Sequence, residues 1–162
     1  MVQTTVNTAT FLADAILFLR DNLDGGVSGQ SIIVDPLTRT GNEKFILTAY
    51  PKRPARYPIL TVIDKAITDQ RPGGFRSETM IVTLVVEVRI WARNVLERDQ
   101  LTQQVTNRLR DIQYATGGTN DAGLYDFRIG SIVNIDEPDE SGEVGVRSKA
   151  IEIAYTLILQ GS

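Results

Sequence analysis

The segment Thr79–Trp91, TMIVTLVVEVRIW, constrains the fold of this chain more than any other stretch. Its side chains alternate, so one face of an extended strand carries only apolar residues: Met80, Val82, Leu84, Val86, Val88 and Ile90. The opposite face mixes polar and apolar side chains: Thr79, Ile81, Thr83, Val85, Glu87, Arg89 and Trp91. Because successive side chains point to opposite faces of a strand, this pattern predicts a long, half-buried, antiparallel strand at the centre of a sheet.

A helix is expected near the N-terminus, capped by Thr8 or Thr10 and continuing to about Leu23. Its apolar residues recur at spacings of three and four and form one stripe: Phe11, Leu12, Ala15, Ile16, Leu19 and Leu23. Asp24-Gly25-Gly26 ends the helix, because glycine adopts the left-handed conformation of a C-cap at little cost.

A second helix is expected to begin at Asn94, with Glu97 in the capping-box position. Its buried stripe comprises Leu101, Val105, Leu109 and Ile112, and its solvent-facing side comprises Glu97, Arg98, Gln103, Gln104 and Arg110. The segment Thr116–Asn120 ends it, since it is rich in glycine and small polar residues.

Five further strands complete the predicted fold. They are Ser31–Val34, Phe45–Tyr50, Ile59–Ile63, Phe127–Ile135 and Val146–Leu159. The first two are expected to form a hairpin with a long tip, and the third could extend toward Thr68. The element order α-β-β-β-β-α-β-β predicts a single α+β domain over residues 1–162, with two helices packed on a mostly antiparallel β-sheet.

The composition excludes most catalytic chemistry. The chain has no cysteine and no histidine, which removes thiolate nucleophiles, soft-ligand zinc sites, Ser-His-Asp triads and histidine acid–base catalysis. Carboxylate-only metal sites and two-carboxylate hydrolases survive this exclusion, although no sequence pattern supports either. We therefore predict a protein that is not an enzyme and uses no cofactor.

The apolar run Phe11–Leu19 has no preceding cationic region and contains Asp14, so we expect neither a signal peptide nor a membrane partner. Two glycine-rich segments, Gly25–Gly29 and Arg71–Gly74, lack the GK[ST] sequence of a phosphate-binding loop and are interpreted as turns.

Acidic residues gather in the segment Asp136–Glu143. Calcium could use such oxygen ligands, but the segment lacks the EF-hand pattern and lies between two predicted strands. Exposed acids at a hairpin tip also have no low-dielectric pocket to separate their pKa values, as a two-carboxylate hydrolase requires. The segment is interpreted as a solvated hairpin tip without a metal.

Basic residues gather in the first half of the chain: Arg39, Lys44, Lys52, Arg53, Arg56, Lys65, Arg71 and Arg76. They could neutralise phosphates of a nucleic acid, yet the net charge is −3 and no pattern that positions bases is present. A solvated loop surface is the simpler interpretation. A third interpretation is that the basic residues take part in self-assembly. In a head-to-tail interface the acidic hairpin of one copy would complement the basic loops of the next.

The candidate interface residues follow from this charge pattern. They are Lys52, Arg53, Arg56, Arg71 and Arg76 in the basic arm and loop, and Asp136, Glu137, Asp139, Glu140 and Glu143 in the acidic hairpin. Exposed ion pairs contribute little on their own, so such an interface also needs apolar burial. Ile81, Val85 and Trp91 either supply it or lie beneath a helix; the sequence leaves both options open.

The arm itself contains Pro51, Pro54 and Pro58, which exclude a helix and a central strand there. Stiffening a segment before it binds lowers the entropy that binding costs. This favours a contact arm over an unstructured loop.

Taken together, the element order, the proline-flanked strand Tyr57–Val62 and the long strand ending in Trp91-Ala92-Arg93 resemble those of tailed-bacteriophage tail terminator proteins, also called tail completion or neck proteins. The resemblance implies a six-membered ring in the virion, assembled in the host cytoplasm, that caps the tail tube and joins it to the head connector. It also implies tail-tube and neck proteins as partners, a sheath protein as a further option, and a channel through which DNA passes without specific binding.

Two alternatives remain open at this point. The first is a related structural role, as a head-completion connector or a tube-like tail protein. The second belongs to another class: a nucleic-acid-binding module that uses the basic loops.

Overall fold

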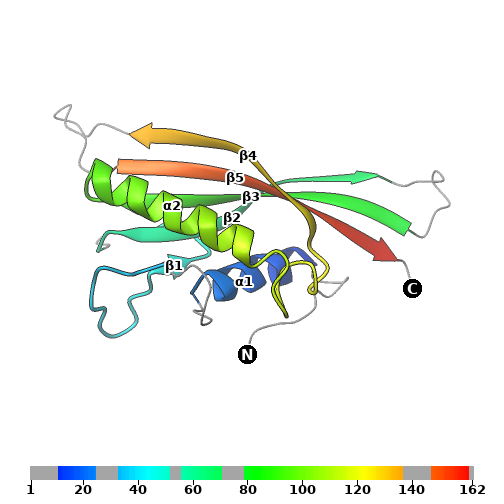
Figure 1. Cartoon of the computed structure of the whole chain (residues 1–162), viewed down its shortest axis with the longest axis horizontal. Helices are drawn as coiled ribbons and strands as arrows, with labels where there is room; N and C mark the ends of the chain where they lie inside the picture. Colours follow the sequence, from blue (N-terminus) through cyan, green and yellow to red (C-terminus); the bar gives the residue numbers. More distant parts are fainter. Residues whose placement is uncertain (1–10, 25–32, 52–55, 71–78, 137–146, 161–162) are drawn as a thin grey trace.

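The computed structural model describes residues 11–24, 33–51, 56–70, 79–136 and 147–160 (Figure 1). The elements in these segments are α1 (Phe11–Asp24), β1 (Ile46–Leu47), β2 (Ile59–Gln70), β3 (Thr79–Ala92), α2 (Val95–Asp111), β4 (Tyr125–Asp136) and β5 (Arg147–Gln160). The strands form one five-stranded sheet in the order β1-β2-β3-β5-β4. Only the short β1–β2 pair is parallel, so the predicted α+β class with a mostly antiparallel sheet is confirmed.

Strand β3 occupies the centre of the sheet, between β2 and β5. From Val82 onward its even-numbered side chains are buried as the alternation predicts, whereas Met80 is only partly buried. Val82, Leu84, Val86, Val88 and Ile90 are at most 1% exposed. The odd-numbered side chains of the strand are only partly buried. We call the even-numbered side of β3 the inner face of the sheet and the other side the outer face.

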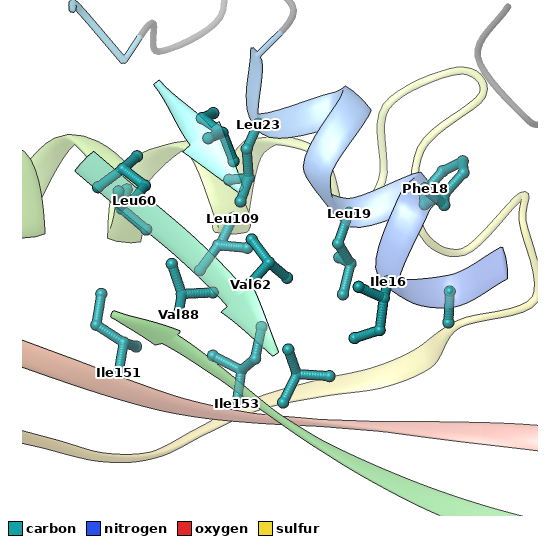
Figure 2. Packing of buried hydrophobic residues seen from close by; sticks show 14 of the residues in the cluster. Ile16, Phe18, Leu19, Leu23, Leu60, Val62, Val88, Leu109, Ile151 and Ile153 are labelled. Carbon is teal, nitrogen blue, oxygen red and sulfur yellow. The ribbon is translucent and has the colours of Figure 1, made fainter. Parts of the chain in front are cut away.

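Both helices pack on the inner face. Figure 2 shows Ile16, Leu19 and Leu23 of α1 and Leu109 of α2 directed toward Val62, Val88, Ile151 and Ile153 of the sheet. Phe18, which the predicted stripe of α1 omits, is fully buried in the same core. The buried face of α1 is therefore wider than the stripe that the three- and four-residue spacings predict.

Helix α2 begins as predicted. The Asn94 side chain accepts a 2.9 Å hydrogen bond from the Glu97 backbone N–H, and the Glu97 carboxylate accepts one from the backbone N–H of Arg93. Arg98 was expected to face solvent, and this is wrong: it is 6% exposed. Its guanidinium lies 3.0 Å from the Asp99 carboxylate, which also accepts from Lys149 of β5 at 2.9 Å, so this side of α2 is tied to the sheet.

A second buried arginine ties the two helices together. Arg108 of α2 is 2% exposed, and its Nε and Nη2 donate hydrogen bonds of 2.9 and 2.7 Å to the backbone carbonyl of Asn22. The last carbonyls of a helix lack partners within the helix, and Asn22 belongs to the last turn of α1. Arg108 therefore caps α1, although burial lowers the pKa of its guanidinium.

The predicted hairpin of Ser31–Val34 and Phe45–Tyr50 is wrong. Residues 33 and 34 lie outside any strand, and β1 contains only Ile46 and Leu47, paired in parallel with Leu60 and Thr61. The described order is therefore α-β-β-β-α-β-β. Local side-chain bonds explain the difference: the Asp35 carboxylate accepts from the Leu37 backbone N–H at 3.0 Å and from Arg39, which favours a turn over a ladder.

The remaining strands are at least as long as predicted. Strand β2 takes up the optional extension and reaches Gln70, with a bulge at Lys65, between Asp64 and Ala66. Strands β4 and β5 pair as an antiparallel hairpin, so the acidic segment does connect two neighbouring strands, although residues 137–146 lie outside the described part. In the described segments no helix is long and apolar enough to cross a membrane.

The buried hydroxyl of Tyr155 provides a test of the core. Tyr155 is fully buried beside Phe127, its hydroxyl has no hydrogen-bond partner among the described residues, and burial raises the pKa of this hydroxyl. Tyr155→Phe should leave the free energy of unfolding unchanged or raise it by about 1 kcal/mol, because it removes an unpaired buried polar group and keeps the ring. Urea unfolding measures the change, with Tyr114→Phe at an exposed site as the control. A loss of stability above about 1 kcal/mol would contradict this packing.

Candidate functional site

The pairing registers define two ends of the sheet. Ile59, Trp91, Ser148 and Ile135 form one row across β2, β3, β5 and β4, and we call this the proximal end. Gln70, Ile81 and Ile158 form another row, which we call the distal end. The rows are separated by most of the length of β2, or roughly 35 Å at about 3.3 Å per residue.

The predicted interface residues attach at different places on this frame. Of these residues only Arg56 and Asp136 are described; Lys52, Arg53, Arg71, Arg76, Glu137, Asp139, Glu140 and Glu143 lie outside the described segments. Arg56 precedes β2 and Asp136 ends β4, so the basic arm and the acidic hairpin both attach at the proximal end. Residues 71–78, which carry Arg71 and Arg76, join β2 to β3 at the distal end. The attachment points of the arm and the hairpin thus share one end of the sheet, and those of the second basic segment lie at the other end.

The arm and the hairpin are also attached to strands near opposite lateral edges of the sheet. Strand β2 and strand β4 are separated by β3 and β5 in the strand order. A basic segment is therefore attached near one lateral edge of the proximal end, and an acidic segment near the other. This is the arrangement that a head-to-tail contact between identical copies requires.

The base of the basic arm is fixed by Arg39, a residue whose structural role the sequence did not reveal. The Arg39 side chain is 9% exposed, forms a 2.6 Å ion pair with Asp35 and lies over the ring of Phe45. Its guanidinium also donates to the backbone carbonyls of Arg56, at 2.9 Å, and of Pro58. The chain is thereby held on both sides of Tyr57, where the arm joins β2.

Arg56, the described cation of the arm, has a partner within the chain. Its guanidinium lies 2.9 Å from the Glu43 carboxylate, with the two side chains 50% and 35% exposed. An exposed pair of this kind contributes little to stability, but it orients Arg56 toward its own loop. Lys52 and Arg53 are therefore better candidates than Arg56 for contact with a second copy.

The outer face of the sheet is the second part of the candidate site. Ile81, Val85 and Trp91 are partly buried and stand apart from the core cluster that the two helices cover, so they do not lie beneath a helix of the described chain. The Trp91 ring is flanked by the Arg89 guanidinium at 4.1 Å and by Tyr50 edge-on, and its indole N–H donates to Thr61 at 3.1 Å. These contacts order the proximal part of the outer face.

Charges on the outer face largely compensate one another. Lys65, in the β2 bulge, forms a 2.6 Å hydrogen-bonded ion pair with Glu152 of β5, and this hydrogen bond raises the pKa of Lys65. Glu87 stands directly opposite Glu152 in the β3–β5 register. Around these charges the face carries small neutral residues, among them Ala66, Thr83, Ala154 and Thr156.

The third part of the candidate site is formed by two strand edges. Strand β4 is the last strand of the sheet, and its outward edge has no neighbour among the described residues. On the other side of the sheet, β1 covers β2 only at Leu60 and Thr61. Open edges present unpaired backbone N–H and C=O groups and are templates for pairing with another chain.

The described part of the chain contains no group of three or more acidic side chains placed to hold a metal ion. Comparison with known proteins adds no assignment, because no family model and no curated protein matches the chain.

The Arg39 clamp gives a direct test of how the arm is held. Arg39→Ala removes the donors to the carbonyls of Arg56 and Pro58, so the start of β2 should open more often. The backbone N–H of Leu60, which donates to the Phe45 carbonyl at 2.8 Å, reports this opening by hydrogen exchange. We expect exchange at Leu60 to accelerate by roughly tenfold or more, which corresponds to about 1.4 kcal/mol. Arg20→Ala on α1 is the control, and equal exchange at Leu60 in both variants would contradict the clamp.

Proposed function

We propose that this chain is a structural subunit of a tailed-bacteriophage tail terminator or neck ring. In this proposal identical copies close head to tail into a ring, which the resemblance to the family makes six-membered. The ring caps the tail tube in the virion and joins it to the head connector, after assembly in the host cytoplasm, and it performs no catalysis.

One observation carries the proposal: the basic arm and the acidic hairpin attach at the same end of the sheet and on opposite lateral sides. When one copy is rotated about an axis beside the sheet, its acidic side meets the basic side of the next copy at the same height. A heterologous contact of this kind generates a ring when the rotation closes.

The outer face supports the same function. It is not covered by a helix of the described chain, and its central charges are compensated by the Lys65–Glu152 pair. A channel for DNA needs a wall that does not bind phosphates tightly, and a compensated surface with small polar side chains meets this need. We therefore propose that DNA passes the ring without a specific binding site.

The nucleic-acid-binding alternative is less well supported. Five of its basic residues belong to two segments that attach at opposite ends of β2, roughly 35 Å apart along the strand. Lys65 lies between these ends, and it is paired with Glu152. A connector or a tube-like tail protein would share the head-to-tail contact. A tube-like tail protein would differ from the proposed ring subunit by forming an open polymer, and a connector would differ by binding a head component alone.

Charge reversal of the arm tests the proposal. The double variant K52E/R53E should lose the ring and its binding to tail tubes, because acidic arms then meet acidic hairpins. Arg56 is left unchanged, since it pairs with Glu43 within the chain. The particle mass is measured by light scattering at near-physiological salt, and tube binding by co-sedimentation.

Two further variants make this test specific. R20E/R110E changes the net charge equally but alters the two helices, and it should keep the ring. Adding D139K/E140K to K52E/R53E restores opposite charges across the contact and should recover at least part of the assembly. A ring that survives K52E/R53E and still binds tubes would contradict the proposed contact.

A further inference from the structure

The exposed apolar residues of β4 face two directions from one open edge. Ile132 is 44% exposed on the inner side, opposite Ile151 in the β4–β5 register, and Val133 is 51% exposed on the outer side, opposite Ala150. The stretch Ser131–Asp136 pairs with β5 without a register shift, whereas both irregularities of β4 lie before it. A long, regular edge with exposed apolar side chains is typical of a strand that pairs with another chain.

The distal part of β2 offers a matching edge on the other side of the molecule. Beyond Thr61 it has no neighbour toward β1 among the described residues, and its side chains from Asp64 to Asp69 are exposed. Ile67 is 44% exposed and lies on the inner side, opposite Leu84, while Ala66 lies on the outer side, opposite Val85.

The strand directions allow these two edges to meet. Three successive antiparallel pairs separate β2 from β4, so the two strands run in opposite directions within one molecule. A neighbouring copy in the same orientation therefore places its β4 antiparallel to β2. The second copy does not have to be inverted. Copies in a cyclic ring all have the same orientation relative to the axis, so this pairing is compatible with a ring.

We infer that β4 of one copy pairs with the distal part of β2 of the next, with Ile132 opposite Ile67 and Val133 opposite Ala66. This inference rests on the self-association that the proposed function requires, and it specifies the surface. The backbone groups of both open edges become hydrogen-bonded, and one sheet continues from copy to copy. The apolar pairs supply the burial that ion pairs between the arm and the hairpin do not provide.

The two faces of the sheet exclude registers that are shifted by an odd number of residues. A shift by one residue would place Ile132 and Ile67 on opposite faces, whereas the inferred register keeps both on the inner side and keeps Val133 with Ala66 on the outer side. Lys65 is a bulge residue without a partner in the β2–β3 pairing. If it is skipped in the new pairing as well, Ile135 lies opposite Ile63, and Asp136 at the end of β4 lies opposite Val62. Pairing then stops next to Thr61, where β1 occupies the edge of β2.

The same register accounts for the charged segments. Beyond Asp136 the chain continues into the acidic residues, at the point where β2 of the neighbour is covered by β1 and approaches Arg56. In this register the attachment point of the acidic hairpin of one copy comes next to that of the basic arm of its neighbour. Pairing of β4 with β4 across a two-fold axis is disfavoured, because it would leave the β2 edge of both copies open.

Disulfide cross-linking tests the register, and the absence of cysteine from the chain makes it clean. The double variant I67C/I132C has its two thiols in the pairing positions of different copies, and residues directly opposite in an antiparallel pair are close enough for a disulfide. After mild oxidation we expect a ladder of linked copies on a non-reducing gel that ends at the size of the native particle. A66C/V133C, at two exposed positions, should give the same ladder.

The single variants I67C and I132C are the controls: each alone should stay unlinked, and an equimolar mixture should give dimers only. A native particle with no cross-link in either double variant would overturn the strand pairing and leave the ring itself standing. Cross-linked dimers of I132C alone would overturn it in favour of β4–β4 pairing. A ladder without an upper limit would support the pairing and contradict the closed ring, and a monomer without cross-links would overturn both.

Discussion

Burial of one face of β3 beneath two helices is the interaction on which the rest of the structure depends. The even-numbered side chains of this strand are almost completely buried, and α1 and α2 meet them from the same side. With both helices on the inner face, the described chain has no element to cover the outer face. The sheet also ends in the unpaired edge of β4 and in the half-covered edge of β2. The surfaces available for assembly thus follow from where the helices pack.

The fold class and the core were predictable because they depend on periodicity. Alternation in Thr79–Trp91 gave the buried face of β3, and spacings of three and four gave Leu101, Val105 and Leu109 in α2. The cap at Asn94 was predictable as well, since it depends on residues close in sequence. Attachment of the acidic segment to a β-hairpin followed from the two alternating strands that flank it.

Features that depend on distant partners were not predictable. Arg108 is buried because the last turn of α1, distant in the sequence, accepts its hydrogen bonds. Arg98 donates to its neighbour Asp99, and the distant Lys149 donates to the same carboxylate and ties this side of α2 to the sheet. A helical pattern alone assigns such side chains to solvent. The hairpin predicted before β2 fails because Asp35 accepts hydrogen bonds from Leu37 and Arg39 within a local turn. This turn is itself held by distant contacts of Arg39 with the backbone carbonyls of Arg56 and Pro58. The relation between the two basic segments was not predictable either, because only the register shows that Arg56 and the segment carrying Arg71 attach at opposite ends of β2.

The central claim of this account is that the two lateral sides of the sheet complement each other, so that identical copies close on themselves without performing chemistry. The mass of the unmodified protein in solution tests it most directly, by sedimentation equilibrium over a wide range of concentrations. The account predicts one discrete particle whose mass is a small whole-number multiple of 17.9 kDa and does not grow with concentration. A protein that stays at 17.9 kDa at every concentration would contradict it.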